Sequence, residues 1–279
     1  IETFRVSKIL AFRGLKQQAI EFAEAGDIVS IAGMNKATVA DTIAEPSVGT
    51  PIPSQPIDPP TITVTFGIND SPLAGRDGKK VQGRVIRDRL LKECESNVAI
   101  KVADTPGGEA FDVSGRGELQ MAILIETMRR EGYEFMVSKP QVITKEENGK
   151  VCEPVENIYL DVQENHVGII TEKLSKRKGR MVNLQNNGFG RVTLDFKIPS
   201  RGLIGFRSQF LTDTKGSGIM NALFDSYAPW FGNIPQRNNG VLIADRNGKI
   251  TTYASLGMAD RGELFEKVST DVYKGMIIG

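Results

Sequence analysis

A segment that occurs twice at a fixed distance constrains the fold of this chain more than any other feature. Residues 111–132, "FDVSGRGELQMAILIETMRREG", align without a gap on residues 196–217, "FKIPSRGLIGFRSQFLTDTKGS", at an offset of 85 residues. Arg116 then matches Arg201, and Gly117 matches Gly202. Because 85 residues is about the size of one small domain, the offset predicts two copies of one structural unit.

The residues around each copy have the same predicted order of strands and helices. From residue 61 the order is strand, helix, strand, strand, helix and strand, with helical spacing of apolar residues in 79–96 and in "GELQMAILIETMRREG". The order recurs from residue 154, with a helix in "HVGIITEKLSKRKG" and a hairpin around Asn187-Gly188. It predicts two ferredoxin-like βαββαβ domains, at 61–142 and 143–226.

The parts of the chain that flank the repeat favour β structure. Residues 1–48 contain alternating stretches such as "FRVSKILAF", and 227–279 contain the strand-like "GVLIAD" and "GKITTYASLGM". Six prolines between residues 46 and 60 exclude a helix or a central strand there, so 49–60 are expected to be a linker. The predicted fold class is α+β. The chain starts as though inside a strand and ends without a polar tail, which predicts a fragment of a longer protein.

Positive charge is concentrated in one part of an otherwise acidic chain. The whole chain has a formal net charge of +1. Residues 166–218 contain ten lysines and arginines against three acidic residues, an excess of +7 that leaves −6 for the remainder. The simplest use of such a segment is binding to a polyanion such as RNA.

The candidate contacts with that polyanion lie in this basic segment. "SKRKGR" at 175–180 places four cations at the predicted end of a helix, more than the one or two that suit a helix dipole. The turn at 200–202 is by itself typical of a helix start capped by serine, but Arg201 in this basic context is expected to contact phosphate. His166, the only histidine, is expected to cap the next helix or to contact phosphate. The candidate nucleic-acid-binding residues are Lys176, Arg177, Lys178, Arg180, Arg201, Arg207, Lys215 and His166.

Two other motifs resemble functional elements without their usual context. "ADTPGG" at 103–108 resembles the Asp-x-x-Gly element of GTPases, but no G-x-x-x-x-G-K-[ST] loop is present, so 104–107 are expected to form a hairpin turn. "NGFGRV" at 187–192 partly matches an RNA-recognition strand motif, but further aromatic residues are missing. Phe189 is therefore expected to pack within its hairpin.

Other function classes receive no support from the sequence. No nucleophile elbow, zincin or kinase signature occurs, and no Cys or His lies near His166 to complete a metal site. No run of about 18 apolar residues indicates a membrane span. Cys94 and Cys152 are the only cysteines, which favours a reducing, cytoplasmic location without disulfides.

Long strings of the sequence resemble the BipA/TypA translational GTPases. The strings are "AGDIVSIAG", "PIDPPTITVTFGINDSPLAGRDG", "VSGRGELQMAILIETMRREGYEF", "KRKGRMVNLQNNGFGRVTLDFKIPSRGLIGFRSQFLTDTKGSGIM" and "QRNNGVLIA". The resemblance extends over essentially the whole chain, and "SRGLIGFRSQFLT" makes it specific. The chain is similar, more distantly, to elongation factor G and LepA.

This resemblance implies a domain order. Residues 1–48 would be the later strands of a translation-factor β-barrel. The two ferredoxin-like domains would correspond to domains III and V of elongation factor G, and 227–279 would begin a family-specific, mostly-β C-terminal domain that is incomplete here. The GTP-binding domain has no counterpart in this sequence, so the resemblance implies GTP and Mg²⁺ for the parent protein only. No catalytic, cofactor-binding or metal-binding residue is assigned to this chain.

The resemblance also implies a partner. It predicts a monomeric, cytoplasmic portion of a factor that binds the ribosome through rRNA, with ribosomal proteins and tRNA as further candidates and no membrane contact. The parent would act in translation, ribosome assembly or the stress response. Two alternatives are a LepA-like or elongation factor G-like protein, and a stand-alone enzyme with its site between the two ferredoxin-like domains. The enzyme alternative lacks a convergent set of nucleophile, base or metal ligands.

Overall fold

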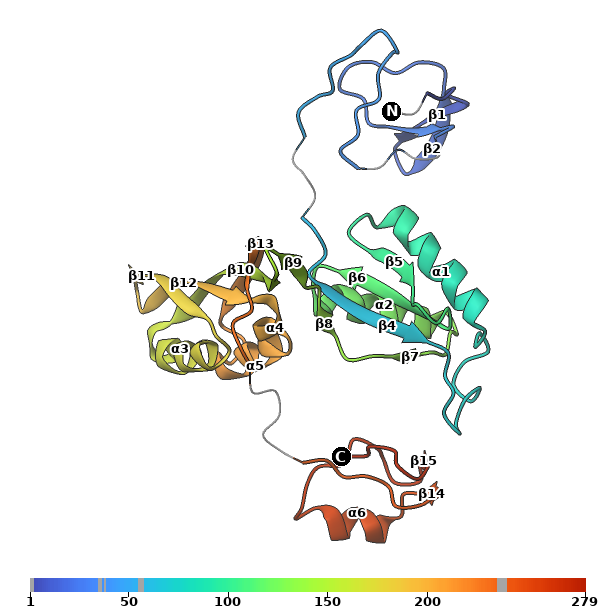
Figure 1. Ribbon diagram of the computed structural model, residues 1–279. Helices are drawn as coiled ribbons and strands as arrows, with labels where there is room; N and C mark the ends of the chain where they lie inside the picture. The colour runs from blue at the N-terminus through green and yellow to red at the C-terminus, as the bar shows by residue number, and fades with distance from the viewer. Residues whose placement is uncertain (1–2, 35–36, 38, 55–57, 235–239) are drawn as a thin grey trace. The chain divides into compact units, whose positions relative to one another are not determined.

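The computed structural model describes residues 3–34, 37, 39–54, 58–234 and 240–279 (Figure 1). These residues form a mixed α/β structure with several antiparallel sheets, none of which closes into a barrel. The chain divides into two compact units, Ile1–Asp58 and Pro59–Gly279. None of the described helices has the length and apolar composition that crossing a bilayer requires.

The first unit contains an open, three-stranded antiparallel sheet. Among the described residues of this unit, Ala11 is the only buried hydrophobic residue, whereas Phe12, Leu15 and Ile28 are exposed. The β structure expected in 1–48 is thus present in the described residues as an open sheet. The strands, in the sheet order β2-β1-β3, are β1 (Lys8–Arg13), β2 (Lys16–Ile20) and β3 (Val29–Ala32).

The second unit starts with a sheet whose helices pack on one face. Alternate residues of its first strand, Ile62, Val64 and Phe66, are buried with Ile86 and Met128 from the two helices. The sheet order is β5-β6-β4-β7. The elements in chain order are β4 (Ile62–Gly67), α1 (Gly83–Ser96), β5 (Lys101–Asp104), β6 (Ala110–Gly115), α2 (Glu118–Arg130) and β7 (Met136–Val137).

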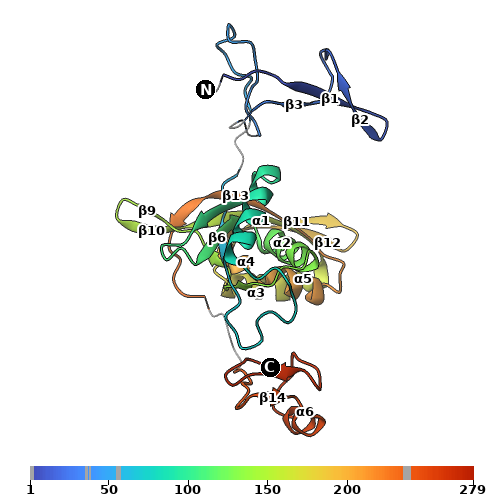
Figure 2. The ribbon, with the colours of Figure 1, turned by 90° about the vertical axis from the view of Figure 1, so that its right-hand side faces the viewer.

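A second sheet in this unit has the strand order β11-β12-β10-β13. Its four main strands are arranged as in the preceding sheet, with the first strand along the chain between the third and the fourth. Figure 2 shows its helices on one side of the sheet, and the short strands β8 (Gln141–Val142) and β9 (Lys145–Glu147) precede it. Its elements are β10 (Lys150–Gln163), η1 (Glu164–His166), α3 (Val167–Lys176), β11 (Arg180–Gly188), β12 (Arg191–Pro199), α4 (Ser200–Leu203), α5 (Phe206–Asp213) and β13 (Ile219–Pro229).

The helix expected after Arg201 is broken into α4 and α5. Gly205 between them has a left-handed backbone with φ 71°, which glycine adopts without a steric penalty. Gly202 lies so close to the end of α3 that a Cβ there would be 2.7 Å from the O of Arg177. The expected cap is also absent, because Pro199 is the N-cap of α4 and no side chain caps this helix.

The C-terminal part contains a helix where the sequence pattern indicated a strand. Residues within "GKITTYASLGM" form α6 (Thr252–Met258), because the hydroxyl of Thr251 accepts the N–H of Ala254 at 3.2 Å and caps the helix. The prediction of strand here is wrong. Two short strands, β14 (Gly248–Lys249) and β15 (Asp271–Val272), pair beside it.

Candidate nucleic-acid interface

The basic turn at residues 176–180 follows the C-terminus of α3. Ile170 and Leu174 anchor α3 in the core. The N–H of Gly179 donates to the O of Leu174 at 2.8 Å and closes the last turn of the helix. Lys178 has a left-handed backbone with φ 70° and an exposed side chain. The end of the helix therefore presents cations to solvent from both sides of the turn.

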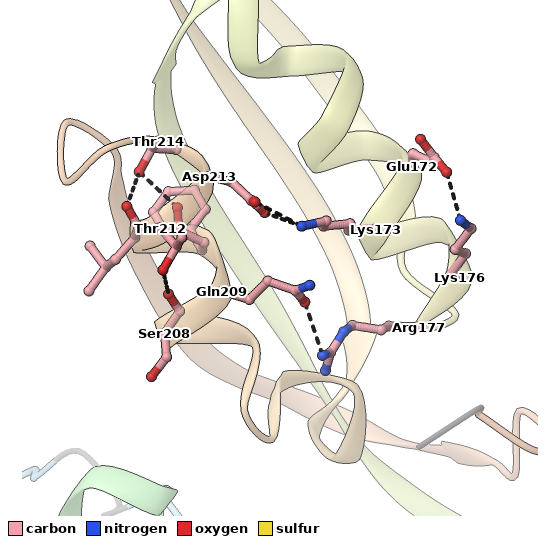
Figure 3. A network of polar contacts seen from close by, with 11 residues as sticks. Glu172, Lys173, Lys176, Arg177, Ser208, Gln209, Thr212, Asp213 and Thr214 are labelled. Carbon is pink, nitrogen blue, oxygen red and sulfur yellow. Dashed lines mark hydrogen bonds and ion pairs between the residues drawn. The ribbon is translucent and has the colours of Figure 1, made fainter. Parts of the chain in front are cut away.

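Arg177 is the member of this turn that points into the protein. Its guanidinium donates to the carbonyl oxygens of Gly202 and Ile204 at 2.9 and 3.0 Å. The guanidinium also donates to Oε1 of Gln209 at 3.3 Å, the bond that Figure 3 shows. It also lies 5.4 Å from the ring centroid of Phe206. Burial lowers the pKa of the Arg177 guanidinium. The phosphate contact expected of Arg177 stays a prediction, while these bonds give its guanidinium a structural role in joining α3 to the α4–α5 junction.

Arg201 is likewise removed from the exposed set. Its side chain is 7% exposed and donates from Nε to Oε2 of Glu153 at 2.5 Å, and Glu153 is completely buried. The guanidinium stacks 3.8 Å from the ring centroid of Trp230 and donates to the O of Gly232. A paired and buried guanidinium cannot reach a phosphate, so the structure assigns Arg201 to the fold.

The remaining cations at this end form a surface that we call the basic end: Lys176, Lys178, Arg180 and Arg207. All four are exposed. Lys176 forms an ion pair with Glu172 at 2.6 Å (Figure 3), and Arg180 lies 5.8 Å from the ring centroid of Phe231. The side chains of Lys178 and Arg207 have no hydrogen-bond or ion-pair partner within the described part of the chain. An exposed pair such as Lys176–Glu172 contributes little, so all four cations can bind phosphate.

Lys215 and His166 lie at the opposite end of the same sheet. Helices α3 and α5 run antiparallel, since Lys173 pairs with Asp213 at 2.6 Å while Arg177 reaches Gln209 (Figure 3). The C-terminus of α5 and the N-terminus of α3 are therefore together, away from the basic end. Lys215 is exposed with φ 50°, and His166 is half-buried. His166 is the N-cap residue of α3 but its side chain makes no capping bond, so the expected cap is wrong.

Folding reduces the local charge that the sequence window indicated. Arg191 pairs with Asp161 at 2.9 Å, and Lys197 pairs with Asp225 at 3.0 Å. Both acidic residues lie outside 166–218, as does Glu153, the partner of Arg201. The excess of +7 counted along the sequence is thus partly neutralised by neighbouring strands.

The structure contradicts the prediction for Phe189 at the hairpin tip and confirms the prediction for the Asp-x-x-Gly turn. The hairpin expected around Asn187-Gly188 is present, but Phe189 and Gly190 form its turn. The prediction that Phe189 packs within the hairpin is wrong, because the residue is fully exposed. The turn after Asp104 is a hairpin turn as predicted, and Asp104 pairs with Arg87 at 2.9 Å.

The buried carboxylate of Glu134, which the sequence did not predict, lies between α2 and β7, beside the sheet β5-β6-β4-β7. Glu134 is 8% exposed and accepts the N–H groups of Gly75 and Gly78 at 2.6 and 2.9 Å, and the Asn69 amide at 2.7 Å. These hydrogen bonds, led by that from Gly75, lower the pKa of Glu134 to about 2. This role is structural. No local sequence pattern indicates it, because the partners of Glu134 lie 56 to 65 residues away along the chain. No group of three or more His, Cys, Asp or Glu residues in the described ranges is arranged to hold a metal ion.

Two family models match this chain in its second unit. Residues 150–238 match the family described as elongation factor G C-terminus, and residues 239–279 match the TypA/BipA C-terminal domain.

Curated relatives match over the whole chain. The large ribosomal subunit assembly factor BipA of Bacillus subtilis is 49% identical over 279 residues, which is 100% of this chain and 46% of that protein. Proteins of the same name from Synechocystis sp. and Escherichia coli (strain K12) are 50% identical over 275 residues and 46% identical over 278 residues, each covering 99% of this chain and 46% of the relative. The chain spans less than half the length of these curated relatives.

Proposed function

We propose that the chain belongs to the TypA/BipA family and forms the ribosome-binding portion of a translational GTPase that acts in assembly of the large ribosomal subunit. The observation that carries the proposal is the 46–50% identity, over 99–100% of the chain, to proteins named for that assembly role. The match of residues 239–279 to the TypA/BipA C-terminal domain favours this family over a LepA-like or elongation factor G-like factor.

We further propose the domain organisation that the sequence predicted. Residues 1–48 are assigned to the later strands of a β-barrel domain, and 61–142 and 143–226 to ferredoxin-like domains related to domains III and V of elongation factor G. The common strand order of the two sheets supports the repeat, and the elongation factor G match at 150–238 supports the second assignment. GTP and Mg²⁺ would be held by residues of the parent protein outside this sequence, and the monomeric, cytoplasmic state remains part of the proposal.

The proposed RNA contact is the basic end. Its four cations are exposed. Arg177 supports this surface by joining α3 to α4, and Arg201 supports it by joining α4 to β10. If the basic end neutralises four phosphates, it should contribute about −3 to −4 to the slope of log K against log salt, from the single-strand and duplex coefficients. Lys215 and His166 are proposed as a separate contact at the other end of the sheet.

The test is binding of the chain to purified large ribosomal subunits over a salt series. Replacing Lys176, Lys178 and Arg207 together by alanine should reduce the magnitude of the slope by about 2 to 3 and weaken binding. The fold should survive, because changes at such exposed positions are each worth about 0.5 kcal/mol or less. Arg177 is left intact because its loss would disturb the α4–α5 junction.

The matched control replaces three other exposed cations, Arg84, Lys92 and Lys101, which lie in or beside α1 and β5. This variant should keep the wild-type slope. An equal fall in slope for both triple variants would mean that binding follows net charge and not the basic end. An unchanged slope in the folded first variant would contradict the proposed contact.

A further inference from the structure

Phe189 at the tip of the β11–β12 hairpin has a backbone conformation that packing does not explain. Phe189 and Gly190 join the two strands, and both have positive φ, 54° and 74°. Asparagine, aspartate and glycine suit these positions, whereas a bulky residue adopts them at a cost. The ring gains no packing in return: Phe189 is 107% exposed, and no ring contact to it occurs in the described part of the chain.

Hydrogen bonds hold this tip in a fixed position. The N–H of Glu164 donates to the O of Gly190 at 2.9 Å, which joins the tip to η1. Asn187 donates from Nδ2 to Oγ1 of Thr193 at 2.6 Å on the neighbouring strand. A ring presented on a rigid turn loses little conformational freedom when a partner binds, so the exposed position is suited to recognition.

The groups around the ring match the chemistry of an unpaired nucleobase. A hollow of about 690 Å³ beside the tip is lined by Gln163, Glu164, Asn165, Phe189, Gly190 and Arg191. Amide side chains offer the donors and acceptors that base edges require, and a carboxylate can accept from an exocyclic amino group. Arg191 also donates to the O of Ser217 at 3.4 Å, which brings the turn with the exposed Lys215 to this end of the sheet.

We propose that Phe189 is a stacking platform for one unpaired RNA base, with Gln163 and Asn165 hydrogen-bonding the base edge. This contact rests on the proposed function for its RNA partner, but it lies at the end of the sheet opposite the basic end and makes a different kind of interaction. An apolar pocket on a protein would also accept a phenylalanine. The amides and the cation around the ring favour the base, because they would lose hydrogen bonds to water against an apolar wall.

The test measures binding of the full chain to RNA extracted from large ribosomal subunits, in parallel with intact subunits. Phe189→Ala should weaken binding to both probes about tenfold to hundredfold, the range given by stacking on one base. The salt slope should not change, because no phosphate contact is lost. Phe189→Trp should bind at least as tightly as the wild type. Phe189→Asn should unfold at the same or a higher temperature, since asparagine suits the turn, but should bind as weakly as the alanine variant.

The matched control is Leu15→Ala, which truncates another fully exposed apolar residue, 101% exposed at the β1–β2 turn, and should leave binding unchanged. Wild-type affinity of Phe189→Ala, or of Phe189→Leu, would overturn the stacking role. A loss of affinity for intact subunits but not for the extracted RNA would identify a protein pocket and also overturn it. Failure of the wild type to bind either probe would overturn the proposed function as well, so the two failures are distinguishable.

Discussion

Arg201 connects three parts of the second unit through one buried guanidinium. It bonds Glu153 near the start of β10, stacks on Trp230 after β13 and belongs itself to α4. Glu153 also accepts the N–H of Phe231 at 2.8 Å, so its carboxylate is held from two sides. A charge pair without access to water is sensitive to the loss of either partner, because the remaining charge has no substitute for its hydration.

Replacing Arg201 by glutamine is therefore expected to lower the free energy of unfolding by about 3–5 kcal/mol. The measurement is urea unfolding followed by circular dichroism, with the fluorescence of Trp230, the only tryptophan, reporting the local environment. Arg207→Gln is the matched control and should change stability by about 0.5 kcal/mol or less, since this arginine is exposed. A loss below about 1 kcal/mol for Arg201→Gln would contradict the buried pair.

At the scale of elements, the parts that depend on local patterns were predictable. The β-rich composition of "TITVTFGI" predicted β4 and helical spacing predicted α2, because each signal lies within the element itself. The break between α4 and α5 was not predictable in this way. It involves Arg177, whose hydrogen bonds reach 25 and 27 residues along the chain.

The candidate site was predictable in the same uneven way. The cluster of cations after α3 was visible in sequence, and Lys178 and Arg207 are exposed as expected. The burial of Arg201 depends on Glu153, 48 residues away, which no charge count along a window can reveal. The exposure of Phe189 followed from the turn taking Phe189 and Gly190 instead of Asn187 and Gly188.

Substitution by alanine should change stability in opposite directions at two glycines, one between α4 and α5 and the other in α3. Gly205→Ala should destabilise the protein by about 1 kcal/mol or more, because alanine at φ 71° is strained and the α4–α5 break requires that conformation. Gly168→Ala should stabilise it by up to about 1 kcal/mol, because this residue lies within α3 and has open space around its Cβ position. Thermal unfolding of both variants is the measurement. Stabilisation by Gly205→Ala would show that α4 and α5 can merge into one helix.

At the scale of the whole chain, the second unit carries both hydrophobic cores. One core lies between α1, α2 and the first sheet, and the other between α3, α5 and the second sheet. No residue of the first unit belongs to either core among the described residues. The first unit contains five lysines and arginines against seven acidic residues in 1–58. Its charge therefore does not favour RNA, and its removal takes no part of the cores away.

A chain that starts at Pro59 is expected to keep the RNA binding of the full chain. Its salt slope should equal that of the full chain, because the basic end, Lys215, His166 and the Phe189 tip all lie in the second unit. Its affinity at low salt should be equal or slightly higher, since the net negative charge of 1–58 is gone. The measurement is the same salt series with large ribosomal subunits, after circular dichroism has shown that the shortened chain unfolds cooperatively. A fall in slope of 1 or more in the folded, shortened chain would assign phosphate contacts to residues 1–58 and limit the proposed role of the basic end.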